Sequence, residues 1–370
     1  MDGAIRQKPF ASIDGFRFLA ALWVFTYHFA PESWRASPLA RAAIEGGQIT
    51  VSALFVLSGF VLAHGRSLPM DREGRARFWV GRFARLYPVH LLGFLLALPF
   101  FIHALARRPD MAVDWRDTLA YLTLTSAWMP RRVFSMHPAG WALSAVAFFS
   151  LVFPFAIRAL ARRSPRGMLG IGCAAWLAGL AAPSLLVALG VPDVDGSIWA
   201  RVVRYDPLLR TAEFLSGVAL GSWWARTRVA PPVWVHPLAL AGWIGLSAAP
   251  IPRGLLHNGL LTPLVALSIV CMSTGRGPLA RALGWRPIAL LGRAGFGMFV
   301  LQFPLRWIVL SAFLLLGWPV GRTTPAFAVS LVVTLAVASG SLMLLERPAQ
   351  ARIVAAWAAR KGRGSTLFES

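Results

Sequence analysis

Long apolar runs separated by short arginine-rich stretches dominate the chain. A helix needs about 20 apolar residues to cross about 30 Å of hydrocarbon. Ten segments are close to that length, at residues 16–30, 50–64, 86–106, 140–157, 168–190, 207–225, 233–249, 255–273, 288–316 and 324–345. The pattern predicts an all-α fold, a polytopic transmembrane helix bundle of about ten spanning helices.

A further apolar stretch at residues 118–128 is too short to cross. About eleven residues at about 1.5 Å each cover only half of the hydrocarbon layer. We interpret this stretch as a short interfacial or re-entrant helix. A crossing here would also move the arginines at 158–166 to the opposite side of the membrane, against the distribution of the other basic residues.

The composition supports a membrane protein. The chain of 370 residues is 57% hydrophobic and 14% charged, whereas a soluble domain carries about a quarter of its residues as charges. In a polar chain the net charge of +22 would suggest nucleic acid binding, but here the basic residues lie between apolar runs. We therefore expect a lipid bilayer and no nucleic acid as a partner. The two cysteines, Cys173 and Cys271, offer no metal-binding spacing, so no metal site is predicted.

Basic residues also predict the orientation. Of the Lys and Arg residues, 23 fall on the side of the termini, 11 on the opposite side, and three, Arg17, Arg210 and Arg306, within helices. This ratio predicts that both termini are cytoplasmic. We expect one integral-membrane domain over residues 1–350 and a basic cytoplasmic tail over 351–370. Asp14 and Arg17 interrupt the first apolar run, which favours a retained helix over a signal peptide.

Ionisable residues inside membrane helices are candidate functional groups because a buried charge is costly. Arg17 and His28 are eleven residues apart, about 1100° of helical rotation and about 16 Å of rise. They therefore share one face of the first helix, which indicates a polar groove through the bilayer. The alternative is that Arg17 reaches the inner headgroups and His28 caps the outer end of the helix.

Other polar residues have weaker spacing signals. Arg210 and Glu213 are three residues apart, which favours a structural ion pair. The amide of Gln302 requires a polar partner in the bundle, and a polar contact with a neighbouring helix is sufficient to explain a glutamine at this position. Arg82 and Arg85 lie on one face before the third span, where they would bind anionic lipid or the phosphates of a cytosolic donor.

Five segments together resemble acyltransferase family 3, the polytopic membrane O-acyltransferases. They are residues 13–28, with Arg17 and His28, then 55–60, 82–88, 213–217 and 346–348, in the order of the family. The resemblance implies transfer of an acyl group, usually acetyl, from cytosolic acyl-CoA to a hydroxyl. The implied acceptor is a cell-envelope glycan, a lipid-linked saccharide or a secreted small molecule. The implied location is the bacterial inner membrane, and acyl-CoA is a substrate rather than a tightly bound cofactor.

By this resemblance His28 is the essential histidine, Arg17 the essential arginine, and Arg82 and Arg85 lie near the donor. A neutral imidazole placed as general base at a hydroxyl supplies about 10²- to 10⁴-fold. Further pocket residues expected from the matching blocks and the intramembrane polar groups are Asp14, Ser58, Trp141, Ser144, Glu213 and Gln302. Direct transfer and an acyl-enzyme route both remain open, and the sequence identifies no oxyanion donor.

Two positions depart from the family. Val146 stands where residues 137–150 resemble a segment with a glutamate, and Gln302 replaces a histidine in residues 296–302. Three explanations compete: His28 and Arg17 suffice; another group such as Glu213 substitutes; or the chain has lost catalysis and is a transporter or structural subunit of glycan export. We favour a working enzyme because Arg17, His28 and both arginines before the third span are retained.

Overall fold

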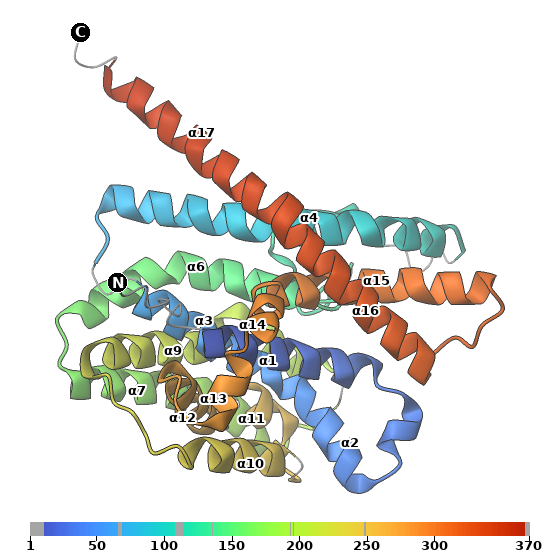
Figure 1. Ribbon diagram of the computed structural model, residues 1–370, viewed down its shortest axis with the longest axis horizontal. Coiled ribbons are helices and arrows are strands. Elements are labelled where there is room, and N and C mark those ends of the chain that lie inside the picture. Colours follow the sequence, from blue (N-terminus) through green and yellow to red (C-terminus); the bar gives the residue numbers. More distant parts are fainter. Residues whose placement is uncertain are drawn as a thin grey trace, which may run out of the picture.

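The computed structural model describes residues 11–65, 69–107, 114–134, 136–192, 194, 196–247 and 249–366. Every regular element in these ranges is a helix, so the predicted all-α class is confirmed (Figure 1). The α-helices are α1 (Ala11–Phe29), α2 (Pro38–Glu45), α3 (Thr50–His64), α4 (Arg72–Arg107), α5 (Trp115–Leu122), α6 (Gly140–Ala161), α7 (Pro165–Ala188), α8 (Ile198–Tyr205), α9 (Pro207–Thr227), α10 (Val235–Ser247), α11 (Arg253–His257), α12 (Thr262–Ser273), α13 (Pro278–Leu283), α14 (Arg286–Arg293), α15 (Gly295–Leu315), α16 (Thr324–Ser341) and α17 (Arg347–Thr366).

Seven helical stretches of the described chain are long and apolar enough to cross a membrane. They are Pro38–His64, Arg72–His103, Gly140–Ala161, Pro165–Ala188, Arg253–Ser273, Gly295–Leu315 and Thr324–Arg360. The protein is therefore a multi-pass membrane protein, but the predicted count of about ten spans is not confirmed. Helices α1 and α9 are long enough and are not among the seven, and each carries an arginine and an acidic residue. Helix α10 has only 13 residues.

Several predicted segments are subdivided. The short stretch at 118–128 forms parts of the eight-residue helix α5 and of a 3-10 turn at Ser126–Trp128, both too short to cross. The segment predicted at 255–273 is broken into α11 and α12, and Gly259 in the break has a φ of +80°. Only glycine adopts such a backbone conformation without strain. The segment predicted at 288–316 is divided into α14 and α15.

Helices α3 and α9 cross at glycines. A Cβ atom at Gly59 would lie 2.2 Å from the carbonyl oxygen of Phe214, and one at Gly217 would lie 2.0 Å from that of Val56. Small residues at a crossing let two backbones approach closely, which is a common way for membrane helices to pack. Two of the segments that carry the family resemblance therefore meet here, at the centre of the bundle.

The C-terminal helices form the outer part of the bundle. Helix α16 continues through a π-helical turn at Leu342–Glu346 into α17, which crosses α4 obliquely and projects from the bundle (Figure 1). Residues 351–366 of the predicted tail are part of α17; the side chains from 361 onward lie outside the described residues. The N-terminal residues before 11, with their two basic side chains, also lie outside them.

Candidate active site

A cavity of about 220 Å³ lies among α1, α3, α4, α6, α14 and α15. Four arginines from three segments line it, namely Arg17, Arg82, Arg85 and Arg293. The remaining wall is largely apolar and includes Phe55, Val146 and Phe299. We call this space the arginine cavity. Its charged groups and apolar wall suit a ligand with an anionic part and an extended apolar part.

Asp14 orders two of the four guanidinium groups. Its Oδ1 lies 2.8 Å from Nη1 of Arg17, and its Oδ2 lies 3.4 Å from Nε of Arg293. Arg82 donates from Nε to Oγ of Ser150 at 3.1 Å. Arg85 is within electrostatic range of the buried Glu346. Two acidic side chains beside four arginines leave the cavity with an excess of positive charge, which favours an anionic ligand.

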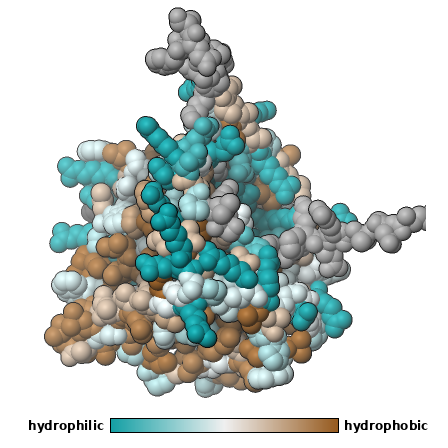
Figure 2. All heavy atoms as spheres, turned by 90° about the vertical axis from the view of Figure 1, so that its left-hand side faces the viewer, coloured by the Kyte–Doolittle hydropathy of each residue, from teal (hydrophilic) through white to brown (hydrophobic). Residues whose placement is uncertain are grey.

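One end of the molecule is rich in basic residues. The start of α4, with Arg72, Arg75 and Arg77, and the turn between α6 and α7, with Arg162 and Arg163, lie on the left of Figure 1. Figure 2 views that end and shows hydrophilic side chains gathered in its upper and middle part, with hydrophobic ones toward the lower edge. Arg82 and Arg85 follow further along α4, so this helix leads from the basic end into the arginine cavity.

His28 lies in a second cavity, of about 370 Å³, which we call the histidine cavity. Polar groups from several elements share it, namely Tyr27, His28, Gln48, Tyr205, His257 and Gln302. The His28 ring packs edge-on against Phe303, with the ring centres 4.8 Å apart. Neither ring nitrogen of His28 has a hydrogen-bond partner among the described residues, so the imidazole is available to a substrate.

The two cavities are neighbours. Val51 and Phe299 line both, while α1 contributes Arg17 to one and His28 to the other. The single continuous helix α1 therefore presents Arg17 and His28 to adjoining spaces, which share the apolar side chains of Val51 and Phe299 in their walls.

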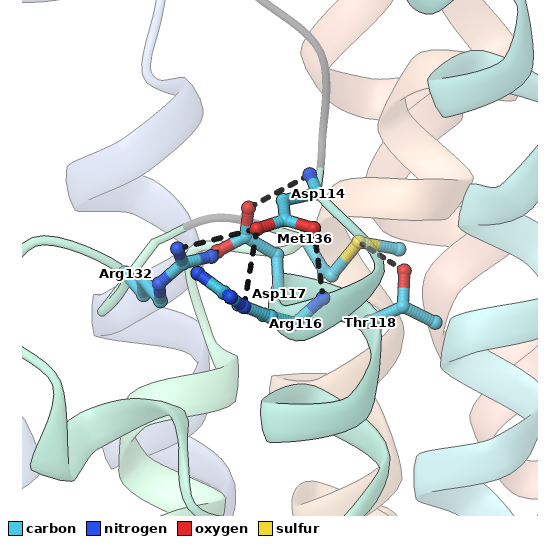
Figure 3. Close-up of polar contacts among 6 residues, drawn as sticks. All are labelled: Asp114, Arg116, Asp117, Thr118, Arg132 and Met136. Atoms are coloured by element: carbon cyan, nitrogen blue, oxygen red, sulfur yellow. Dashed lines mark hydrogen bonds and ion pairs between the residues drawn. The ribbon is translucent and has the colours of Figure 1, made fainter.

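A salt-bridged loop contributes Phe134 to the wall of the histidine cavity. Arg132 donates from Nη1 to Oδ1 of Asp117 at 2.6 Å, and Asp114 caps α5 (Figure 3). The hydrogen bond that Arg132 donates to Asp117 raises the pKa of its guanidinium above the ordinary value. Since Phe134 follows Arg132 closely and lines the cavity, this charged cluster anchors part of the cavity wall to α5.

The remaining predicted residues fall in different places. Ser58 lines the arginine cavity, and Trp141 and Gln302 line the histidine cavity. Ser144 lines neither of them in the described structure; its Oγ lies 3.3 Å from Oγ of Ser126 and accepts from a backbone amide. Glu213 is also outside both linings, in a buried ion pair with Arg210 of 3.0 Å. Val146 lines the arginine cavity, so the carboxylate of a glutamate at this position would face the arginines and not His28, which lines the other cavity.

The sequence alone does not single out five polar residues that line the cavities, namely Arg293, Tyr27, Gln48, Tyr205 and His257. Nothing in the local sequence marks Arg293 or Tyr205, because both reach the cavities through packing of distant helices. A signal did exist for His257, since His257 and Asn258 are two consecutive polar residues within a predicted apolar span.

Comparison with known proteins agrees with this architecture. The model of a family described as an acyltransferase domain matches residues 10–343. The chain belongs to this acyltransferase family. It is accordingly an enzyme that transfers acyl groups other than aminoacyl groups. No solved structure shows a significant match to the chain.

This acyltransferase has relatives of two sizes. It is 28% identical over 365 residues to the acyltransferase MdmB of Streptomyces mycarofaciens, covering 91% of this chain and 90% of the relative. It is 24% identical to the peptidoglycan O-acetyltransferase OatA of Listeria monocytogenes, covering 81% of this chain and 50% of the relative. Identity to the O-acetyltransferase OatA of Staphylococcus aureus is 22%, with 91% and 56% covered. The chain thus spans about half the length of these O-acetyltransferases.

Proposed function

We propose that this acyltransferase moves an acyl group, acetyl in the simplest case, from acyl-CoA in the arginine cavity to an acceptor hydroxyl in the histidine cavity. The observation that carries the proposal is the pair of adjoining cavities along α1, one lined by four arginines and the other by His28, with Val51 and Phe299 in both walls. We place the enzyme in the bacterial inner membrane with both termini in the cytoplasm, as the distribution of basic residues supports.

The donor assignment follows from charge. Guanidinium groups bind phosphate oxygens in pairs, and coenzyme A carries several phosphates at the end opposite its thioester. The arginines suit the phosphate-bearing end, whereas the apolar wall toward Val51 and Phe299 suits the thioester arm. The thioester would thereby reach the side of the histidine cavity.

The chemical step uses His28 as general base. The imidazole takes the proton of the acceptor hydroxyl as its oxygen attacks the thioester carbonyl carbon; the carbon–sulfur bond then breaks and the proton passes to the coenzyme A thiolate. No serine or cysteine is among the described residues that line the histidine cavity. A direct transfer therefore requires fewer assumptions than an acyl-enzyme.

The acceptor class is supported by the relatives. Two of them are named as O-acetyltransferases, one of peptidoglycan, which favours a cell-envelope glycan or a lipid-linked saccharide. MdmB is named only as an acyltransferase and is the relative of matching length, so a secreted small molecule with a free hydroxyl is the other acceptor class that we include.

The test is loss of transfer when the base is removed. We expect His28→Ala to lower the transfer of labelled acetyl from acetyl-CoA by at least about 10²-fold, because the general base at the acceptor hydroxyl is lost. Purified protein in lipid nanodiscs, a soluble peptidoglycan digest and a panel of hydroxylated small molecules would be used. His236→Ala, a buried histidine on α10, is the matched control.

Wild-type activity in His28→Ala would contradict the assignment of the base. A transporter or structural subunit would neither bind nor hydrolyse acetyl-CoA, and His28→Ala would then behave as the wild type.

A further inference from the structure

A buried polar chain links three helices to the histidine cavity. Oε2 of Glu213 lies 3.0 Å from Nη2 of Arg210, and the same Nη2 donates to Oγ of Ser52 at 3.0 Å. Oγ of Ser52 in turn donates to the backbone carbonyl of His257 at 2.9 Å. The chain therefore runs from α9 through α3 to the last residue of α11.

The ion pair in this chain is fully enclosed. Arg210 is 0% and Glu213 is 2% exposed, and the guanidinium lies over the rings of Phe55 and Trp141, at 5.2 and 5.8 Å. A buried ion pair adds little net stability compared with apolar residues of the same size. Its guanidinium packs on Trp141, which lines the histidine cavity, and this contact points to a role in shaping that cavity.

Glu213 also sets the backbone beyond His257. A Cβ atom at Gly259 would lie 2.8 Å from Oε1 of Glu213, and the φ of Gly259 is +80°. The chain ending at Glu213 thus fixes the segment 257–259 at two points, through the carbonyl of His257 and through close packing on Gly259. This contact accompanies the break between α11 and α12.

The His257 ring faces the same cavity as His28. The residue is 5% exposed, and its Nδ1 is enclosed without a hydrogen-bond partner in the described part of the chain. Nε2 has no partner there either and is not enclosed, so it is the ring nitrogen open to the cavity. Beside it stand Tyr205, with ring centres 6.0 Å apart, and Trp141 next to Tyr205 at 4.9 Å.

We propose that His257 is an acceptor-binding residue, which holds the hydroxylated acceptor by a hydrogen bond at its open Nε2 while His28 takes the proton. Ser52, Arg210 and Glu213 are positioning residues that keep the imidazole in place. This proposal rests on the proposed function, because it requires that the acceptor enter the histidine cavity.

Kinetics of His257 variants test the binding role. With the peptidoglycan digest dosed by mass as acceptor, we expect His257→Ala to raise the apparent KM for the acceptor by about tenfold, the contribution of one hydrogen bond to a buried group. The KM for acetyl-CoA should stay at the wild-type value, because His257 does not line the arginine cavity. His257→Gln, whose amide nitrogen approximates Nε2, should restore part of the affinity, and His236→Ala is the control.

A second pair of variants tests the positioning chain without removing the ion pair. Ser52→Ala deletes only the bridging hydroxyl and should raise the KM for the acceptor by about threefold with an unchanged kcat, a smaller effect than that of His257→Ala. Ser222→Ala is the matched control, since Ser222 is a buried serine whose hydroxyl bonds only within α9. A change in Ser52→Ala that affects kcat and KM of both substrates alike would indicate a general structural role and overturn the positioning proposal.

The outcomes separate the two proposals. An unchanged acceptor KM in His257→Ala, or an equal rise in the KM for acetyl-CoA in this variant, overturns the assignment of His257 while leaving that of His28 intact. A second measurement needs no acceptor. Diethyl pyrocarbonate carbethoxylates accessible imidazole nitrogens, and mass spectrometry identifies which histidines it has modified. If no acceptor is acetylated at all, the proposed acceptor class is wrong. If His257 is also unmodified by the reagent, the accessibility of its Nε2 is wrong as well, and the proposed binding role of His257 is overturned. Modification of His257 but not of His90, whose Nε2 bonds the backbone carbonyl of Tyr121 and whose Nδ1 is enclosed, supports the geometry.

Discussion

At the scale of single residues, Arg17, Arg210 and Arg306, the three arginines predicted to lie within membrane helices, have three different roles. Arg17 lines the arginine cavity and pairs with Asp14, whereas Arg210 is sealed in an ion pair with Glu213. Arg306 donates to the carbonyl oxygens of Ala326 and Gly321, and so ties α15 to the start of α16. All three satisfy the requirement that a buried charge be paired or hydrogen-bonded, but only Arg17 faces a cavity that a ligand can enter.

Arg293 provides a prediction at this scale. We expect Arg293→Gln to raise the KM for acetyl-CoA by about tenfold, because one charge-assisted hydrogen bond to phosphate is lost. The KM for the acceptor should not change. Arg281→Gln, an exposed arginine on the neighbouring α13, is the control for loss of basic charge, and equal effects of both variants would assign the change to the general charge of that face.

At the scale of elements, packing decides which helices hold the site. The crossing of α3 and α9 brings Ser52 beside Arg210, and the π-helical turn at the end of α16 brings Glu346 within range of Arg85. Helices α3 and α9 carry glycines where their backbones approach each other, and they carry Ser52 and Arg210 where the two side chains form a hydrogen bond. Local sequence therefore predicts that each helix forms, whereas the crossing point depends on the facing helix.

The glycine crossing gives a prediction of stability. Gly217→Ala should lower the free energy of unfolding by about 1–3 kcal/mol, since the new Cβ would overlap the carbonyl of Val56 unless the helices separate. Thermal unfolding in detergent measures the effect. Gly170→Ala on α7, where a Cβ meets nothing within 4 Å, should be neutral or slightly stabilising; equal unfolding temperatures for the two variants would show that the crossing is looser than described.

At the scale of the whole molecule, the basic end and the positions of the two cavities indicate the side of the membrane from which each substrate would enter. The part of α4 that follows the basic end lines the arginine cavity, whereas the C-terminal end of α1 and the N-terminal end of α6 line the histidine cavity. A donor from one side of the membrane and an acceptor from the other would meet at the wall of Val51 and Phe299. Such a path requires no transport of the whole donor across the membrane.

Cysteine labelling tests this direction. In a background with Cys173 and Cys271 replaced by serine, we expect a membrane-impermeant maleimide to label Ser33→Cys in intact cells, because Ser33 is exposed in the short 3-10 helix Glu32–Arg35 on the predicted outer side. Arg163→Cys, in the turn between α6 and α7, should be labelled only after the cells are opened. The reverse pattern would contradict the cytoplasmic placement of the basic end.

The sequence alone determined the helical membrane class, because apolar length and internal backbone hydrogen bonding are local properties. It also predicted the shared face of Arg17 and His28, since helix geometry fixes the direction of residues eleven positions apart; the catalytic roles of these residues and of Arg82 and Arg85 stay predictions. Only the tertiary structure decided that Arg293 and His257 join the cavities, that Ser144 and Glu213 do not line them, and that two cavities share a wall. Those relations connect residues far apart in the chain, and close packing between helices, rather than any local pattern, determines which side chains meet.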